Sequence, residues 1–143
     1  MNDQDILLVE DNPDDELLAI RALKKHHVAN RIVVARDGQE AIDYLANEAN
    51  PLPGLVLLDL KLPKLSGLDV LQRLRAAERT RILPVVILTT SKEEQDLLDS
   101  YRGGCNSYIR KPVDFAEFSE AMRQLNMFWL ILNEPPPHVG GTP

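Results

Sequence analysis

The sequence predicts an α/β fold, in which a doubly wound sheet of five parallel strands carries helices on both faces. Two observations predict it. Five short apolar runs are bounded by turn residues, which is the pattern of strands buried on both faces. Segments with apolar residues at helical spacing separate these runs, and strands that alternate with helices through short connections form a parallel sheet. With 143 residues, 44% of them hydrophobic, the chain suits one compact domain with a sizeable core.

An acidic turn separates the first strand from the first helix. Residues 6–9 are wholly apolar and run into Glu10-Asp11, after which Asn12-Pro13 breaks the strand. Proline and the acids at 14–16 are favourable in a first helical turn, so we expect a helix over about residues 13–27.

The next three elements are also marked by turn residues. Residues 31–35 form a second apolar strand, Asp37-Gly38 turns the chain, and residues 40–46 carry apolar residues on one helical face. The third strand, over residues 55–59, follows Pro53-Gly54 and ends at a carboxylate.

Prolines mark the elements that follow. A helix over residues 68–74 comes after Pro63, and Pro84 opens a fourth strand over residues 85–88. A short fifth strand is expected over residues 107–110.

Two further helices complete the alternation. A polar helix is expected over residues 93–101, with Leu97, Leu98 and Tyr101 facing inward. The last helix is expected over about residues 115–132. We expect one domain over residues 1–133, and a flexible tail rich in proline and glycine over residues 134–143.

Composition excludes several classes of function. The formal net charge is -6 and the pI is near 5.0, which argues against nucleic-acid binding because phosphates require a basic surface. The single cysteine, Cys105, allows no internal disulfide and fits a reducing cytoplasm. No apolar run approaches the roughly 20 residues of a membrane span, and the acidic N-terminus is not typical of a signal peptide.

The residues that carry chemistry stand at the carboxyl ends of the predicted strands. These are Glu10, Asp11, Asp59, Thr89, Thr90 and Lys111. In a doubly wound sheet these ends share one edge, where ligands bind. Carboxylates gathered there repel one another unless a cation joins them, and Mg2+ prefers carboxylate oxygens together with a phosphate. A hydroxyl and an ammonium suit a phosphoryl group, and a carboxylate can itself be the nucleophile that forms an acyl phosphate.

Each of these residues has a simpler interpretation when taken alone. Asp59 could begin a loop or cap the next helix, although Ser66 is better placed for the cap. The acidic pair could be a solvated turn, the threonines a strand-end cap and Lys111 a surface residue. The functional hypothesis depends on all of them falling on one edge of one alternating pattern.

Four motifs resemble the receiver domain of bacterial two-component response regulators, and the resemblance extends over about residues 6–132. They are Leu8-Val9-Glu10-Asp11-Asn12, the segment from Leu57 to Gly67 (Leu-Leu-Asp-Leu-Lys-Leu-Pro-Lys-Leu-Ser-Gly), Leu88-Thr89-Thr90-Ser91 and Ser107-Tyr108-Ile109-Arg110-Lys111-Pro112. The resemblance implies a flavodoxin-like (βα)5 fold with strand order 2-1-3-4-5.

The resemblance also implies a role for each site residue. Asp59 would be the phosphoacceptor for a sensor histidine kinase, and Lys111 would pair with the phosphoryl group. Mg2+ would be held by Asp11, Asp59 and the backbone carbonyl of Lys61, with Glu10 assisting through water.

The remaining implied roles concern the response to phosphate. Thr89 would give its hydroxyl to the phosphoryl group, and the Thr90 backbone N–H would be a second donor. Tyr108 would be the switch aromatic that turns inward when Thr89 moves, and the bond before Pro112 would be cis. The chain would then be a switch without an output domain of its own, capable of self-catalysed phosphorylation and slow auto-dephosphorylation but not an enzyme.

Further segments resemble a single-domain subgroup that is often partnered with phytochrome-type histidine kinases. They are Asn12-Pro13-Asp14-Asp15, Ala35-Arg36-Asp37-Gly38, Leu88-Thr89-Thr90-Ser91 and the Phe-Trp-Leu at residues 128–130. The expected partner is therefore a kinase of this type.

The last predicted helix suggests a second contact. Its apolar stripe comprises Phe115, Phe118, Met122, Leu125, Trp129 and Leu132. Residues 127–132 are apolar all round, so a face beyond the one on the sheet needs a cover. A homodimer through this helix is our expectation; the kinase or the proline-rich tail are the alternatives.

Three other functions fit parts of the pattern. A phosphatase of the aspartyl-phosphate type needs a second acid two residues after the nucleophile, where Lys61 stands. A flavodoxin-like cofactor carrier needs a phosphate loop after the first strand, where residues 10–15 are acidic. A degenerate receiver would act as an interaction module only, yet the expected site residues are all present.

Overall fold

The computed structural model describes residues 5–25 and 28–125 and has the predicted architecture. Five parallel strands form one sheet in the order β2-β1-β3-β4-β5. The strands are β1 (Ile6–Val9), β2 (Ile32–Ala35), β3 (Leu55–Asp59), β4 (Val85–Thr89) and β5 (Ser107–Arg110). The helices are α1 (Pro13–Lys25), α2 (Gly38–Ala46), α3 (Gly67–Ala76), α4 (Glu94–Arg102) and α5 (Phe115–Gln124). Both the fold class and the strand order are confirmed.

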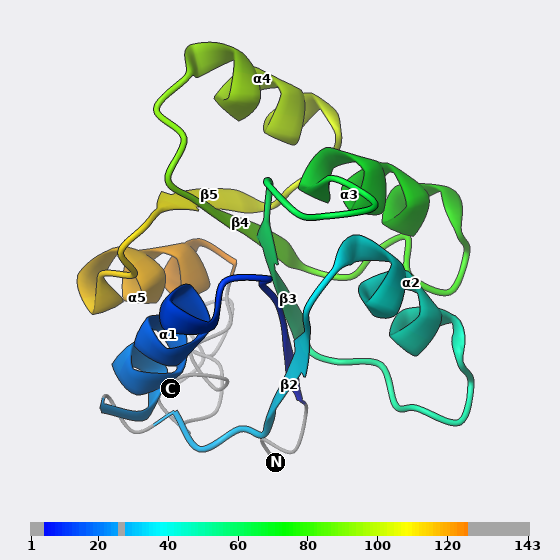
Figure 1. The fold of residues 1–143 in the computed structure, drawn as a ribbon, viewed down its shortest axis with the longest axis horizontal. Helices are drawn as coiled ribbons and strands as arrows, with labels where there is room; N and C mark the ends of the chain where they lie inside the picture. The colour runs from blue at the N-terminus through cyan, green and yellow to red at the C-terminus, as the bar shows by residue number, and fades with distance from the viewer. Residues whose placement is uncertain (1–4, 26–27, 126–143) are drawn as a thin grey trace, which may run out of the picture.

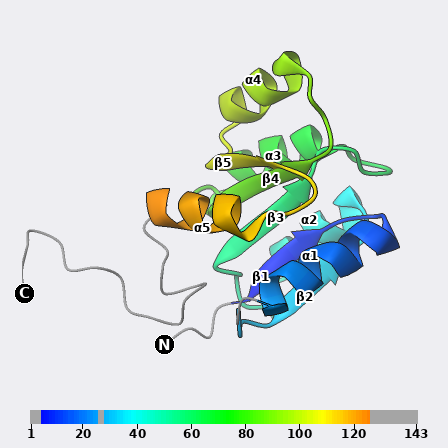
Figure 2. The same ribbon diagram turned by 90° about the vertical axis from the view of Figure 1, so that its left-hand side faces the viewer.

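The sheet has a hydrophobic layer on each face. Alternate strand residues point to opposite faces, so Leu8 and Leu57 pack towards α1 and α5 while Leu7 and Leu58 pack towards α2 and α3. Figure 1 shows α1 and α5 on one side of the sheet and α2 and α3 on the other, and Figure 2 shows the same layers after a quarter turn. This double burial explains why the strand sequences are continuously apolar.

The helix starts are fixed by side-chain caps. Asp37 caps α2 by accepting the Glu40 backbone N–H at 2.7 Å, which starts this helix two residues before the predicted boundary. Ser66 and Asp69 form a reciprocal capping box at α3. Ser66 is therefore the cap of the helix after β3, which leaves the Asp59 side chain for other contacts.

One prediction about α4 is wrong. Leu98 and Tyr101, expected to face inward, are 44% and 50% exposed. Ser100 is fully buried and Leu97 is half-buried, so these two residues, three apart, set the inward stripe. Leu98 and Tyr101 each lie one position further around the helix, which turns them towards solvent.

The predicted last helix is described in part. Helix α5 runs to Gln124, and Leu125 follows as its C-cap. The proposed dimer segment over residues 127–132 and the predicted tail lie outside the described residues. Within the described part of the chain, no helix is long and apolar enough to cross a membrane.

Candidate functional site

The site residues are positioned by the carboxyl ends of four strands. Glu10 and Asp11 follow β1, Asp59 ends β3, Thr89 ends β4 and Lys111 follows β5. Because β1, β3 and β4 are neighbours and β5 lies beside β4, these residues line one edge of the sheet. The edge includes the point where the chain order reverses between β1 and β3, which is where open α/β sheets bind ligands.

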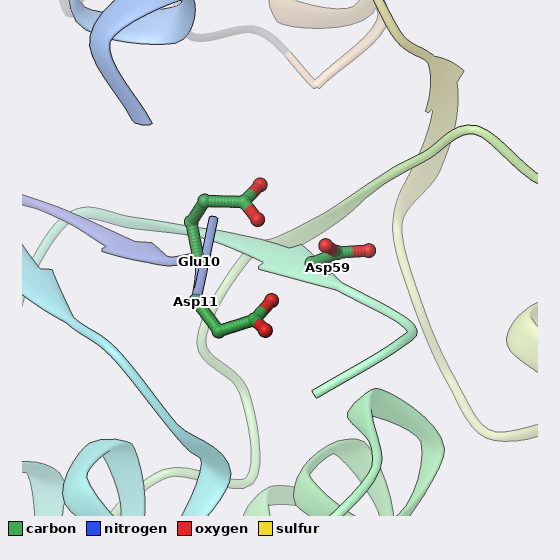
Figure 3. A group of neighbouring side chains, drawn as sticks. All are labelled: Glu10, Asp11 and Asp59. Carbon is green, nitrogen blue, oxygen red and sulfur yellow. The ribbon is translucent and has the colours of Figure 1, made fainter. Parts of the chain in front are cut away.

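Three carboxylates meet at this edge. Glu10, Asp11 and Asp59 each offer an oxygen, and these atoms lie within 4.8 Å of one another. Figure 3 shows Glu10 and Asp11 projecting from the end of β1 beside Asp59 at the end of β3. Glu10 and Asp59 are buried, at 2% and 7% exposure, whereas Asp11 is open to solvent. The arrangement offers hard oxygen ligands with an exposed side through which a divalent cation could enter.

Lys111 balances the buried negative charge. Its Nζ donates a hydrogen bond to Glu10 Oε1, and further bonds of 3.0 Å each to Asp59 Oδ2 and Asp15 Oδ2. The other Asp59 oxygen, Oδ1, accepts the Lys61 backbone N–H at 3.2 Å. Both Asp59 oxygens are therefore oriented, one by an ammonium and one by the turn that follows β3.

Burial and charge shift the pKa values in opposite ways. Burial, together with the charge of Asp59, raises the pKa of Glu10 to about 7 against the opposing effect of Lys111. Burial alone would lower the pKa of Lys111, but its hydrogen bond to Glu10 and the charge of Asp59 outweigh burial and raise it. Lys111 therefore stays a cation at any physiological pH.

Backbone contacts hold the strand ends together. The Lys111 N–H donates to the Thr89 carbonyl oxygen at 2.8 Å, which fixes the start of the β5–α5 loop against the end of β4. The peptide bond between Lys111 and Pro112 is cis, as the resemblance implied. Beside Lys111 lies a cavity of about 230 Å³, whose lining includes Asp15, Leu18 and Thr90.

Thr89 connects the site to α4 through Ser91. The fully buried Thr89 accepts the Ser91 N–H at its hydroxyl oxygen, at 3.1 Å. The Ser91 hydroxyl donates to Asp96 in the first turn of α4 at 2.6 Å, and the Ser91 carbonyl accepts the Tyr108 hydroxyl at 3.4 Å. Tyr108 is half-buried and thus reaches the site indirectly.

Some of the predicted site residues are in direct contact in the structure, and others only adjoin them. Glu10, Asp59 and Lys111 are in direct contact and Asp11 adjoins them. Contacts that sequence reasoning missed are the one from Asp15 to Lys111 and the Ser91–Asp96 pair. The sequence pattern indicates only that Asp15 is an acid in the first turn of a helix. Because Asp15 and Lys111 are 96 residues apart along the chain, no local pattern predicts their contact.

The chain matches one family over most of its length. The family model of the response regulator receiver domain matches residues 6–123. The probable methanogenesis regulatory protein FilR2 of Methanothrix harundinacea is 41% identical over 134 residues, which cover 92% of this chain and 86% of that protein. Response regulator Rcp1 of Synechocystis is 36% identical over 129 residues, covering 87% and 88% of the two chains.

Solved structures agree with this match. The bacteriophytochrome response regulator AtBRR is 50% identical, with a TM-score of 0.82 over 94% of this chain and 100% of that chain. The Mn2+-bound form of Rcp1 is 34% identical, with a TM-score of 0.74 over 94% and 99%. The phosphorylated cyanobacterial phytochrome response regulator RcpA is 36% identical, with a TM-score of 0.75 over 95% and 99%.

Proposed function

The chain belongs to the response regulator receiver domain family, and on that premise we propose that Asp59 is the residue on which it accepts a phosphoryl group. Receivers are two-component signalling switches, not classical enzymes; they take the group from a histidine kinase onto an aspartate with Mg2+. The observation that carries the choice of Asp59 is its position at the end of β3, in contact with Lys111 and beside Glu10 and Asp11.

The transfer is a displacement at phosphorus by a carboxylate oxygen of Asp59. A bond forms between this oxygen and phosphorus while the phosphorus–nitrogen bond of phosphohistidine breaks, and the imidazole leaves with the electron pair. Lys111 supplies a positive charge beside the oxygen that reacts, and Thr89 donates its hydroxyl to the phosphoryl group. The Thr90 backbone N–H is the second donor.

The acidic cluster fits a divalent cation. Asp11, Asp59 and the Lys61 backbone carbonyl would hold Mg2+, with Glu10 assisting through water, because hard cations prefer oxygen ligands. When bound, Mg2+ neutralises the repulsion between these carboxylates and the phosphoryl oxygens. The same site would also hydrolyse the acyl phosphate slowly, so that the protein returns to its starting state by itself.

The phosphoryl group would change the surface through Thr89. Drawing the Thr89 hydroxyl towards phosphate pulls on the Ser91 N–H, and Ser91 contacts both Tyr108 and α4. Tyr108 then turns inward, so the chemical step biases a two-state element. The switch acts by altering protein contacts.

The proposed upstream partner is a phytochrome-type histidine kinase. The support is the 50% identity to a bacteriophytochrome response regulator, together with the similarity to RcpA, a cyanobacterial phytochrome response regulator. We further propose a cytoplasmic location, and a homodimer formed through the C-terminal helix. Crosslinking or light scattering, with and without phosphorylation, measures that association.

Phosphorylation by acetyl phosphate tests the function directly. The wild-type protein with Mg2+ should gain one phosphoryl group in its intact mass, and it should gain none in EDTA. Asp59→Asn should remain unmodified with Mg2+, while the control Asp69→Asn, which alters the exposed cap of α3, should be modified like wild type. A folded wild-type protein that forms no adduct would contradict the proposed function, and the hypothesis of a degenerate receiver that acts only as an interaction module would remain.

A further inference from the structure

Asp15 lies in the first turn of α1, directly after the acidic strand end. The Asn12 side chain caps this helix by accepting the backbone N–H groups of Asp14 and Asp15, at 2.8 and 3.1 Å. With Asn12 as the N-cap and Pro13 as the first helical residue, Asp15 occupies the third helical position. An acid at that position commonly accepts the backbone N–H of the cap residue.

Helix α1 uses this acid differently from α3. In α3 the equivalent acid, Asp69, accepts the N–H of the cap residue Ser66 at 3.3 Å. In α1 the N–H of Asn12 is taken by Glu10 Oε2 at 3.2 Å. Glu10 thus satisfies the cap and leaves the Asp15 carboxylate free to turn across the site to Lys111, where it lies 3.0 Å from Nζ.

The three carboxylates around Lys111 are not equivalent. An ammonium has three N–H donors, and these meet Glu10, Asp15 and Asp59. Glu10 and Asp59 belong to the cluster that could hold a cation, whereas Asp15 does not. A cation and a phosphoryl group would take over the two shared carboxylates, and Asp15 is the partner that neither of them needs.

We propose that Asp15 is a positioning residue, which holds the Lys111 ammonium on the α1 side of the pocket for the incoming phosphoryl group. The proposal rests on Asp59 being the phosphoacceptor. Without Asp15, Lys111 is left with the two carboxylates that take part in the chemistry. It then competes for them and lies less often where the phosphoryl oxygens arrive.

The test compares three variants of the first turn of α1 in the full chain. Asp15→Asn removes the contact. Asp14→Asn removes the same charge from an exposed neighbour whose carboxylate makes no ion pair within the described residues. Asp15→Glu keeps a carboxylate that can reach Lys111. With Mg2+ and acetyl phosphate saturating, we expect Asp15→Asn to be phosphorylated about tenfold more slowly than Asp14→Asn, and Asp15→Glu to recover most of the rate.

A second measurement asks whether the effect passes through Lys111. Brief acylation with an acetyl N-hydroxysuccinimide ester reports the accessibility of each lysine by peptide mass spectrometry. Lys111 should be labelled several-fold more in Asp15→Asn than in Asp14→Asn. Lys64, whose side chain is 67% exposed, serves as the internal reference in both.

Each outcome decides the proposal. A lower phosphorylation rate in Asp15→Asn than in Asp14→Asn, together with stronger labelling of Lys111, supports the proposal. Equal rates for the Asp15→Asn and Asp14→Asn variants, while the wild type forms its adduct, would overturn the role of Asp15 and leave the proposed function intact. A slower rate with unchanged Lys111 labelling would also overturn it, because the effect would then be structural. A wild type that forms no adduct would remove the proposed function and this role together.

Discussion

Glu10 carries a carboxyl group that is almost fully buried beside a second carboxylate. Its neighbour Lys111 favours the ionised form, but burial and the charge of Asp59 prevail and raise the pKa of Glu10. A site that must hold a cation keeps these acids together at a cost in stability when the cation is absent. The pH dependence of the free energy of unfolding therefore reports how unfavourable it is to bury these carboxylates together.

The raised pKa of Glu10 predicts a loss of stability with rising pH in EDTA. Between the ordinary value of 4.5 and about 7, the folded state binds more protons than the unfolded state. The free energy of unfolding should therefore fall across this window by up to about 3 kcal/mol.

Urea denaturation at pH 5, 6, 7 and 8 measures this loss. Glu10→Gln cannot titrate and should show a shallower decline over the same window. Equal slopes for Glu10→Gln and wild type would contradict the assignment of the effect to Glu10.

The residues of the site could be predicted from the sequence, but not all of the contacts between them. Asp59 and Lys111 were found because strand ends of a parallel sheet share an edge. The contact between Lys111 and Asp15 was not found, because it depends on which N–H the Glu10 carboxylate accepts at the start of α1. A choice between two local hydrogen bonds leaves no periodic pattern in the sequence.

At the scale of elements, the backbone at the start of α3 packs very closely against the end of β3. The Gly67 backbone passes so close to β3 that an added Cβ would lie 2.2 Å from the Asp59 carbonyl oxygen and 2.6 Å from Leu60 Cα. The Gly67 N–H also donates to the Leu60 carbonyl oxygen at 2.8 Å. This contact sets where the end of β3 lies, and with it the Asp59 side chain.

Gly67→Ala should therefore damage both stability and acceptance of phosphate. Backbone atoms must move to admit the methyl group, so we expect a loss of about 2 kcal/mol or more in the free energy of unfolding. Phosphorylation by acetyl phosphate should also slow. Gly103→Ala is the control, since there the nearest atom is a terminal methyl of Leu71 at 3.0 Å and the nearest backbone atom, the Asp99 carbonyl oxygen, lies 3.2 Å away. Similar losses in the two variants would contradict this role of Gly67.

Element boundaries were predicted to within two residues where the structure describes them, apart from the end of α5, which lies at Gln124 with Leu125 as its C-cap. The β3 boundaries agree because the apolar run is bounded by turn residues, while α2 begins early because Asp37 supplies a cap. The orientation of α4 was not predictable from its leucines. Ser100, a small residue, is the one buried in this helix, and small polar residues do not mark an inward stripe.

At the scale of the whole molecule, Ser91 joins the site to the α4 surface. Glu93 makes no side-chain cap at α4. The Ser91 hydroxyl instead accepts the Glu93 N–H at 3.2 Å and donates to Asp96. The first turn of α4 is thus held by a residue whose backbone N–H contacts Thr89.

This connection predicts how α4 responds to phosphorylation. In wild type, hydrogen exchange over residues 94–101 should change when Asp59 is phosphorylated. Ser91→Ala should exchange faster in this segment before phosphorylation, by about fivefold for the loss of roughly 1 kcal/mol, and should respond less to phosphorylation. Ser66→Ala removes a serine cap from α3 and should affect α3 alone. An undiminished response in Ser91→Ala would mean that the signal takes another route.

The central claim is that Asp59 carries the phosphoryl group, and localising the modification tests it most directly. Borohydride reduces an acyl phosphate to an alcohol, so reduction of the phosphorylated protein followed by peptide mass spectrometry marks the modified residue. We predict homoserine at position 59 and an unaltered side chain at Asp11 and Glu10. A mark at Glu10 or Asp11, or a phosphoryl group that resists borohydride, would contradict the account.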